Sequence, residues 1–251
     1  MRHSSSGTTG LKALVTATPI IGPMARRLAR SAPVEALRRQ LQFRGSSEYW
    51  EERYRSGGNS GAGSYGRLAD FKAEVLNEFV AREAIGSIVE LGCGDGAQLE
   101  LARYPSYVGI DVASASIALC RARFAEDDGK RFYHTAELPP DLGRFDLALS
   151  LDVIYHLVED AVFEAYMREL FALSRRYVVI YASNQAQPTD SPHVRHRQFT
   201  RWVAAQQPGW QLHGFIPNRY PYDPALPEDT SFADFHIYRR EDQDAADAAQ
   251  A

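Results

Sequence analysis

Residues 88–96 have the sequence Ile-Val-Glu-Leu-Gly-Cys-Gly-Asp-Gly, which is the strongest indication of the fold in this chain. Apolar positions lead into a glycine-rich turn and helix-compatible residues follow over 97–103, which predicts a buried parallel strand, a tight turn and a helix. The glycines allow positive φ angles and let a ligand lie directly on the main chain. The next predicted strand, 108–111, ends in Asp111, whose carboxylate is placed to hold both hydroxyls of a ribose.

The charges around this turn distinguish between two kinds of ribose-bearing ligand. Gly92, Gly94 and Ala97 match the spacing of the dinucleotide fingerprint, so an NAD-dependent reductase is one alternative. However, Glu90 and Asp95 would repel a pyrophosphate docked at a helix N-terminus. They suit a ligand whose nearby end carries an ammonium and a sulfonium. A strand, turn and helix that bind no ligand are the remaining alternative.

Together with Asp111, residues 89–96 resemble the first two motifs of class I S-adenosylmethionine-dependent methyltransferases, and the matching pattern runs from about residue 49 to residue 181. The resemblance implies S-adenosyl-L-methionine as the cofactor. It also implies a Rossmann-like α/β fold. In this fold a mostly parallel seven-stranded sheet has helices on both faces and an antiparallel C-terminal strand, and an N-terminal helical extension precedes it.

The resemblance also implies which residues contact the cofactor. Related enzymes often place an acidic residue after the third strand to bind the adenine amino group, but here Thr135 occupies that position. We therefore expect the backbone of Ala136 or the side chain of Glu137 to serve instead. The expected cofactor-binding residues are Glu90, Gly92, Cys93, Gly94, Asp95, Gly96, Asp111, Val112, Ala136, Glu137 and Leu151.

Hydrophobic periodicity and turn signals predict the remaining elements. The expected helices cover residues 49–54, 68–84, 114–124, 163–173 and 199–205. The expected strands cover residues 131–134, 145–150 and 177–181, followed by a closing antiparallel pair, 210–216 and 232–238. Ser46 or Ser47 is expected to cap the first of these helices, and Ser114 the third.

The composition is that of an ordinary globular protein, with 251 residues of which 45% are hydrophobic and 24% charged. No apolar run approaches the roughly 20 residues of a membrane span. The two cysteines, Cys93 and Cys120, fit a reduced protein, which we expect to be cytoplasmic. The net charge is −4, but residues 1–45 carry +7 and residues 46–251 carry −11. An acidic main domain argues against a nucleic-acid substrate.

Charge and composition divide the chain into three parts. Residues 1–45 form a basic, partly disordered extension, whose near-helical leucine and arginine spacing suits a helix packed on the domain or contact with an anionic membrane or a protein partner. Residues 46–240 form the methyltransferase domain, and residues 241–251 form a disordered tail. Within the domain, residues 46–66 are expected to fold over the cofactor as a lid, as in the methyltransferases that the chain resembles. A plain linker is the alternative.

The stretch after the fourth predicted strand holds the candidate catalytic residue, because open α/β sheets place their chemistry at the carboxyl ends of the strands. His156 is the candidate base, since histidine titrates near neutrality and an alcohol acceptor needs a base as it attacks. Asp152, four residues earlier on a predicted helical turn, is placed to orient it. The alternatives are a helix N-cap for Asp152 and a structural role for His156, and Tyr155 is a further candidate donor.

A second polar cluster follows the fifth predicted strand. Two arginines can clamp a phosphate or carboxylate, so we expect this loop to contact the acceptor, with a solvated loop as the alternative. The candidate substrate-binding residues are His193, Arg195, His196 and Arg197. The spacing of the histidines and acidic residues matches no metal motif, so no metal site is predicted.

These observations favour an enzyme that transfers a methyl group from S-adenosyl-L-methionine to a small polar acceptor. We favour a hydroxyl of a sugar or natural product as the acceptor, because residues 49–54 and 151–156 resemble uncharacterised methyltransferases of surface-glycan or natural-product pathways. The alternatives are N-methylation of an amine and a non-catalytic partner subunit that binds S-adenosyl-L-methionine.

Overall fold

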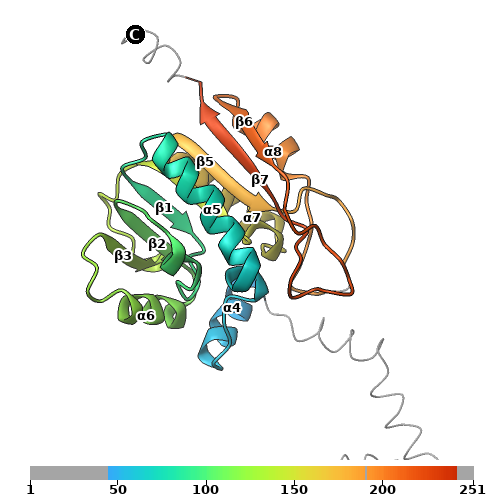
Figure 1. Ribbon diagram of the computed structural model, residues 1–251, viewed down its shortest axis with the longest axis horizontal. Coiled ribbons are helices and arrows are strands. Elements are labelled where there is room, and N and C mark those ends of the chain that lie inside the picture. Colours follow the sequence, from blue (N-terminus) through green and yellow to red (C-terminus); the bar gives the residue numbers. More distant parts are fainter. Residues whose placement is uncertain (1–44, 190, 242–251) are drawn as a thin grey trace, which may run out of the picture. The chain divides into compact units, whose positions relative to one another are not determined.

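Seven strands form one mixed sheet in the computed structural model, which describes residues 45–189 and 191–241 (Figure 1). Their order is β3-β2-β1-β4-β5-β7-β6, and neighbours are parallel except for the antiparallel pairs β5–β7 and β7–β6. The strands are β1 (Ile88–Leu91), β2 (Tyr107–Asp111), β3 (Lys130–His134), β4 (Phe145–Leu151), β5 (Ser174–Ala182), β6 (Trp210–Ile216) and β7 (Asp234–Arg240). This topology confirms the predicted Rossmann-like fold.

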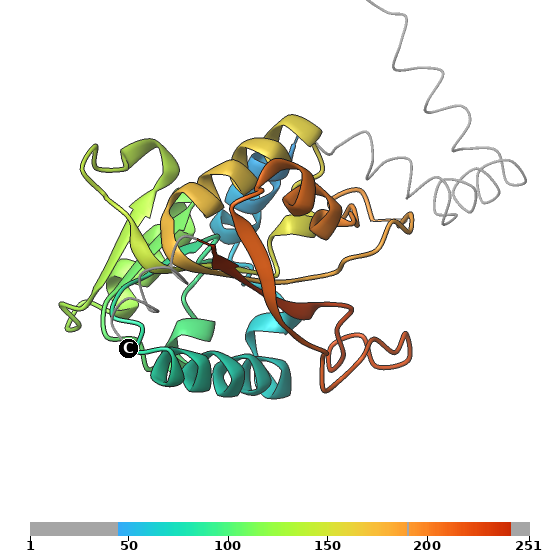
Figure 2. The same cartoon turned by 90° about the horizontal axis from the view of Figure 1, so that it is seen from above.

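Helices cover both faces of the sheet (Figures 1 and 2). The α-helices are α4 (Ser46–Arg55), α5 (Gly66–Arg82), α6 (Ser114–Arg123), α7 (Asp160–Ala172) and α8 (Phe199–Gln206). Helices α5 and α6 contribute Phe79 and Ile117 to the core cluster on one face. Helices α7 and α8 contribute Met167 and Phe199 to the cluster on the other face. Both faces of the central strands are therefore buried.

Burial on both faces explains why the central strands have continuous apolar runs rather than an alternating pattern. In β1, Ile88 belongs to the cluster with α5, whereas its neighbour Val89 belongs to the cluster with α7. Strand β4 is buried along its whole length. Residues that follow these strands therefore emerge together at the carboxyl edge of the sheet, where ligands bind in open α/β folds.

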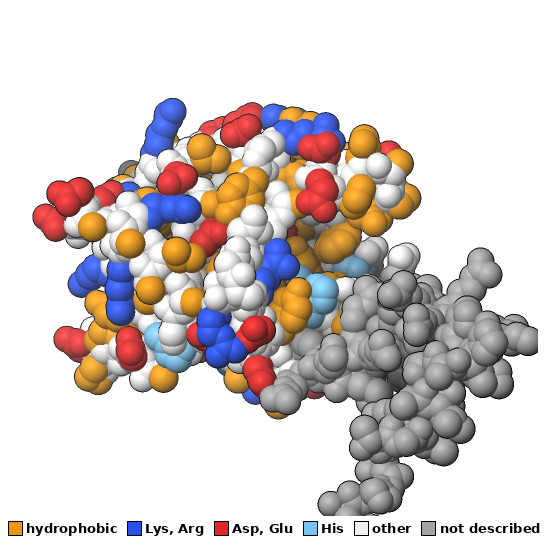
Figure 3. All heavy atoms as spheres, turned by 90° about the horizontal axis from the view of Figure 1, so that it is seen from below, with side chains coloured by type: hydrophobic (Ala, Val, Ile, Leu, Met, Phe, Trp, Pro, Cys, Tyr) orange, Lys and Arg blue, Asp and Glu red, His pale blue; other side chains and the backbone are white. Residues whose placement is uncertain are grey.

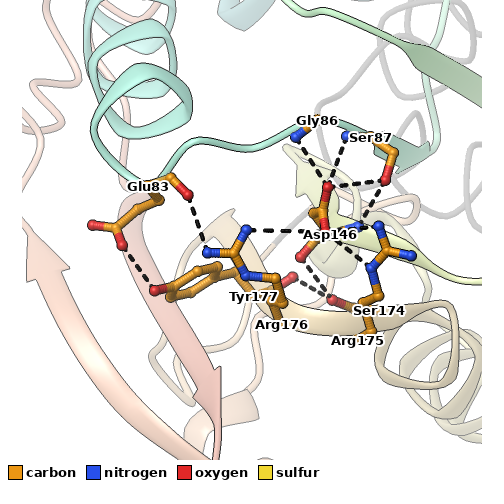
Figure 4. A network of polar contacts seen from close by, with 8 residues as sticks. All are labelled: Glu83, Gly86, Ser87, Asp146, Ser174, Arg175, Arg176 and Tyr177. Carbon is orange, nitrogen blue, oxygen red and sulfur yellow. Dashed lines mark hydrogen bonds and ion pairs between the residues drawn. The ribbon is translucent and has the colours of Figure 1, made fainter. Parts of the chain in front are cut away.

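At the amino-terminal ends of the central strands, Asp146 near the start of β4 is the centre of a hydrogen-bond network (Figure 4). Its Oδ2 accepts the amides of Gly86 and Ser87 at 2.9 and 3.0 Å, and its Oδ1 accepts Nε of Arg175 at 2.9 Å. Burial alone would raise the pKa of this carboxyl. The hydrogen bonds from Arg175 and the amides outweigh burial, so the net effect is a lowered pKa. Asp146 thus links the entry of β1 to β5 and has a structural role.

The segment after the glycine turn is shorter than predicted. Instead of a helix over 97–103, the chain forms only the 3-10 turn η2 (Gln98–Leu101). Gly96 enters this turn with a φ of 76°, and Pro105 disfavours helical backbone angles just after it, so both ends of this stretch oppose an α-helix. The turn therefore offers no full helix N-terminus to an anionic ligand.

The predicted serine caps are wrong. Helices α4 and α6 begin at Ser46 and Ser114 themselves, and neither helix has a side-chain hydrogen bond at its N-cap. The hydroxyl of Ser46 instead donates to Oε2 of Glu159 at 2.6 Å, which ties the start of α4 to the start of α7. The other predicted helices and strands correspond to observed elements.

The N-terminal extension and the C-terminal tail lie outside the described residues, apart from Gly45 and Glu241. Their disorder, and membrane or partner contact by the extension, therefore stay predictions. Of the helices that the structure describes, none has both the length and the apolar character that crossing a bilayer requires.

Candidate functional site

A cavity of about 460 Å³ opens at the carboxyl ends of β1, β2 and β4. Open α/β sheets bind ligands at this edge, and a cavity of this volume suits a nucleoside-sized ligand. Its wall comes from the glycine turn, the strand ends, α4 with the loop that follows it, and α7. Of the predicted cofactor contacts, the wall includes Glu90, Gly92, Cys93, Gly94, Asp111, Val112 and Leu151.

Close contacts as well as backbone angles require glycine in the turn. Gly92 and Gly94 have φ angles of 85° and 58°. A Cβ on Gly92 would lie 2.4 Å from Cγ2 of Val153, and one on Gly94 would lie 2.4 Å from Oγ of Ser60. Asp111 also holds the turn in place, since its Oδ2 accepts a hydrogen bond from the Gly94 amide at 2.9 Å. The predicted ribose-binding carboxylate therefore lies directly beside the turn.

Carboxylates outnumber fixed positive charges on the cavity wall. Glu90, Asp111, Asp152 and Glu169 line it, and among the described lining residues Lys72 is the one lysine or arginine. Burial raises the pKa of Glu90 to about 7, and the hydrogen bond from Tyr107 at 2.7 Å opposes this rise. Burial also raises the pKa of Asp111, against the hydrogen bonds from backbone amides. A wall with this imbalance favours a cationic ligand.

Asp95, a predicted cofactor contact, does not belong to the described cavity wall. Its carboxylate accepts the amide and the hydroxyl of Ser60 at 3.1 and 2.7 Å, and the hydroxyl of Tyr65 at 2.8 Å. Both donors belong to the glycine-rich segment between α4 and α5. Asp95 therefore holds this segment against the glycine turn, and its role as a lid stays a prediction.

Gly96 and Cys93 have packing roles in the turn. Gly96 is absent from the described cavity wall, and a Cβ on it would lie 2.8 Å from the ring of Phe124. Cys93 lines the cavity, and its contact with Cys120 and its burial raise the pKa of its thiol. Cys93 is therefore a neutral, small side chain that fills space beside the ligand.

The cavity wall near β3 differs from the prediction. Val112 and Thr135 line it, whereas Ala136 and Glu137 do not belong to the described wall. The exposed carboxylate of Glu137 lies 3.6 Å from the guanidinium of Arg121 instead. The geometry thus gives no support to an adenine contact by Ala136 or Glu137.

His156 lies on the cavity wall beside α4. Its ring meets that of Trp50 edge to face at 4.8 Å, and its Nδ1 lies 3.0 Å from the carbonyl oxygen of His193. Because a carbonyl oxygen only accepts, Nδ1 carries the proton and Nε2 keeps its lone pair. Burial lowers the pKa of His156 to about 4, so the expected titration near neutrality is wrong and the ring is neutral at pH 7.

The prediction that Asp152 orients His156 is wrong. Asp152 has a φ of 60°, and the residues after it form the 3-10 turn η4 (Ile154–His156), so the two side chains do not share a helical face. Oδ2 of Asp152 lies 2.7 Å from Nζ of Lys72, and Oδ1 accepts the Tyr155 hydroxyl at 2.8 Å. Asp152 is not a helix N-cap either.

Residues 88–176 match the family model described as a methyltransferase domain. This part of the chain is thus similar to a methyltransferase domain. No curated protein matches its sequence.

Solved structures similar to this chain support the fold. The N-methyltransferase NodS from Bradyrhizobium japonicum, in complex with S-adenosyl-L-homocysteine, is 15% identical, with 78% of this chain and 98% of that chain covered and a TM-score of 0.59. Magnesium protoporphyrin IX methyltransferase from Synechocystis, with bound S-adenosylmethionine, is 15% identical, with 87% and 96% covered and a TM-score of 0.50. The methyltransferase domain of a bacterial Hen1 protein is 15% identical, with 67% and 96% covered and a TM-score of 0.53.

The loop after β5 does not form the predicted arginine clamp. Arg195 and Arg197 both lie 3.0 Å from Oδ1 of Asp160. Nδ1 of His196 lies 2.6 Å from the Ser183 hydroxyl. The arginines thus hold the start of α7, and none of the four predicted substrate-binding residues belongs to the described cavity wall.

Sequence reasoning did not identify two side chains of the cavity wall, Lys72 and Trp50. A signal for Lys72 exists, because it lies four residues after Leu68 and four before Leu76, on the buried face of α5. A lysine in such an apolar stripe points to a buried charge with a specific partner. Trp50 carries no comparable signal, since an aromatic residue on a helix more often packs in a core.

Proposed function

We propose that this protein uses S-adenosyl-L-methionine to methylate a hydroxyl group of a small polar acceptor, a sugar or a natural product. The main support is the charge of the cavity wall, where the carboxylates of Glu90, Asp111 and Asp152 are opposed by one lysine. This wall suits the sulfonium and ammonium of S-adenosyl-L-methionine. It disfavours the two phosphates of NAD, the cofactor of the alternative reductase.

Each end of the cofactor has matching groups on the cavity wall. We place the ribose hydroxyls at Asp111, whose carboxylate lies beside the glycine turn. The adenine fits between Val112 and Thr135, and the glycine turn lets the methionine part approach the main chain. This arrangement points the sulfonium methyl group toward the part of the cavity that His156 lines.

His156 is the proposed general base. A sulfonium methyl group is already activated, so the protein chiefly aligns acceptor and methyl group for in-line displacement. The acceptor oxygen bonds to the methyl carbon, the carbon–sulfur bond breaks with its electron pair going to sulfur, and the hydroxyl proton moves to Nε2 of His156. A base with a pKa of about 4 suffices late in this step, because the oxygen becomes strongly acidic as it gains the methyl group.

Rings around the proposed base support a small ring-shaped acceptor. Trp50 and His156 both line the cavity, and their rings meet edge to face at 4.8 Å. Ring surfaces with few polar groups are typical of small-molecule sites. Acidic and basic side chains are interspersed on the face in Figure 3, unlike the basic stripe of a nucleic-acid-binding surface.

The test combines cofactor binding with methyl transfer. Calorimetry with S-adenosyl-L-homocysteine measures binding, and labelled S-adenosyl-L-methionine measures transfer to a panel of sugars, phenols and amines. We expect methylation of a hydroxyl compound, lowered roughly 10²- to 10⁴-fold by His156→Ala. His213→Ala, on β6, is the control and should keep full activity. Methylation of amines alone would establish the N-methyltransferase, and binding without any transfer would favour the partner subunit.

A further inference from the structure

A buried ion pair is built into the wall of the cofactor cavity. Nζ of Lys72 on α5 lies 2.7 Å from Oδ2 of Asp152, which follows β4. The lysine side chain is 1% exposed and the aspartate side chain 15% exposed, and both residues line the cavity. Burying two charges is expensive, and apolar side chains of similar size often stabilise a fold as well or better. The position of this pair on a cavity wall therefore indicates a role in binding.

The surroundings hold this pair in one geometry. Asp152 has a φ of 60°, a conformation that is strained for a residue with a side chain, and such strain clusters at functional sites. Tyr155 donates to Oδ1 of Asp152 at 2.8 Å, and the Asp152 amide donates to the carbonyl of Tyr181 at 2.9 Å. Nζ of Lys72 also lies 5.3 Å from the centre of the Tyr181 ring.

The glycine-rich segment between α4 and α5, which we call the lid segment, lies against the same pair. A Cβ on Gly63 would lie 2.6 Å from Oδ2 of Asp152, so the Gly63 backbone rests directly above the carboxylate. Exclusion of water at this point strengthens charge interactions with a ligand. Other partners for an anionic group are scarce here: η2 is only a 3-10 turn, and His156 is neutral at pH 7. The described wall therefore offers an anionic ligand group one fixed cation, Lys72.

We propose that Lys72 and Asp152 together bind the zwitterionic amino-acid end of the cofactor. Lys72 takes the carboxylate of the methionine part and Asp152 takes its ammonium, so each charge of the protein pair gains a second partner. This inference rests on the proposed function, since it concerns the same cofactor. It assigns a specificity role to a lysine that lies outside the glycine turn and the strand ends.

Three ligands that differ in the charges of their amino-acid end test the two contacts separately. S-adenosyl-L-homocysteine carries both charges, S-adenosyl-3-thiopropylamine carries the ammonium alone, and 5′-methylthioadenosine carries neither. Calorimetry should show that the wild-type protein binds S-adenosyl-L-homocysteine about tenfold or more tightly than the ligand that lacks the carboxylate. Lys72→Met should remove this difference and leave affinity for 5′-methylthioadenosine unchanged.

Asp152→Asn tests the other half of the pair. It should weaken S-adenosyl-L-homocysteine and S-adenosyl-3-thiopropylamine by about tenfold, and leave 5′-methylthioadenosine unchanged. Lys130→Met is the matched control, because Lys130 on β3 also pairs with an aspartate, Asp127, but does not belong to the described cavity wall. It should bind all three ligands as the wild type does.

Three results would overturn the inference. One is equal affinity of the wild type for S-adenosyl-L-homocysteine and S-adenosyl-3-thiopropylamine, which needs no variant. Another is equal weakening of all three ligands by Lys72→Met, which would make the lysine a purely structural residue. If Lys72→Met does not fold, the double variant Lys72→Met/Asp152→Asn replaces it and removes both charges. The third contradicting result is a double variant that still prefers S-adenosyl-L-homocysteine to the ligands without the full zwitterion. Failure of the wild type to bind any of the three would instead contradict the proposed function.

Discussion

Ser60 and Asp95 join the lid segment to the glycine turn. The Ser60 hydroxyl donates to Oδ1 of Asp95 at 2.7 Å, and the Ser60 amide donates to Oδ2 at 3.1 Å, across 35 residues of sequence. In return, the Asp95 amide donates to the Ser60 hydroxyl at 3.0 Å. Asp95, a predicted cofactor contact, thus holds the glycine-rich segment between α4 and α5 against the glycine turn.

These hydrogen bonds predict how the lid segment responds to ligand. Amides of residues 57–66 should gain protection from hydrogen exchange when S-adenosyl-L-homocysteine binds, because the ligand and the lid close the same cavity. Asp95→Asn should speed exchange in this segment and increase the dissociation rate of the ligand by about tenfold, since it weakens charge-assisted hydrogen bonds. Asp127→Asn, in an exposed turn, is the control. Exchange that is equally fast with and without ligand would show a plain linker.

Asp111 should account for a large part of cofactor affinity. Asp111→Asn keeps the shape of the side chain but loses the charge that holds the ribose hydroxyls, so affinity for S-adenosyl-L-homocysteine should fall roughly 10- to 100-fold. Asp146→Asn is the matched control, because Asp146 lies at the opposite edge of the sheet and contacts only the protein (Figure 4). It should lower the melting temperature without changing affinity. Unchanged affinity in Asp111→Asn would remove Asp111 from the site.

Glu90 should release protons when the cofactor binds. Its pKa of about 7 in the free protein means that about half of the carboxyls are protonated at pH 7. A cationic ligand favours the charged carboxylate and lowers this pKa, so binding at pH 7 releases a fraction of a proton. Calorimetry in two buffers of different ionisation enthalpy measures that release. It should vanish near pH 9 and in Glu90→Gln, and proton uptake would contradict a cationic ligand.

The pKa of His156 sets the acid limit of the reaction. Because burial lowers this pKa to about 4, the base stays unprotonated through pH 5, and the pH–rate profile should fall only near pH 4. The same shift affects stability: between pH 4 and 6.5 the unfolded chain binds the proton and the folded chain does not, so His156 makes stability rise with pH. A rate that falls below pH 6.5 would show an exposed or differently placed base.

Arg197 should matter for stability rather than for acceptor binding. Its side chain is 11% exposed, pairs with Asp160 and donates to the carbonyl of Val158 at 2.8 Å. Arg197→Gln should therefore lower the free energy of unfolding by about 1–2 kcal/mol in urea titrations. Arg195→Gln, at a half-exposed position, should cost less. A raised KM for the acceptor without loss of stability would restore the predicted arginine clamp.

The fold could be predicted because its signals are local. The apolar run of β1, the glycines with positive φ and the aspartate that ends β2 lie within one short stretch, and each constrains the backbone directly. The predicted helix over 97–103 is wrong, because helix propensity in this stretch is outweighed by Gly96 at one end and Pro105 at the other. The structure has only a 3-10 turn there.

The site could be predicted only in part, because its decisive contacts are long-range. The spacing of Asp152 and His156 suggested a shared helical face, but the contact that fixes Asp152 comes from Lys72, 80 residues earlier. Likewise, the arginines after β5 have the composition of an anion clamp, and only the structure shows that Asp160 engages both. Sequence spacing identifies candidate groups, whereas tertiary contacts decide which of them remain available to a ligand.

Titration of the cofactor product into the protein shows whether the cavity binds S-adenosyl-L-methionine or a dinucleotide. We predict that calorimetry of the full chain with S-adenosyl-L-homocysteine shows one molecule bound per chain with micromolar affinity, weakened by Asp111→Asn, and that NAD⁺ under the same conditions shows no binding. Binding of NAD⁺ together with no binding of S-adenosyl-L-homocysteine would contradict the account.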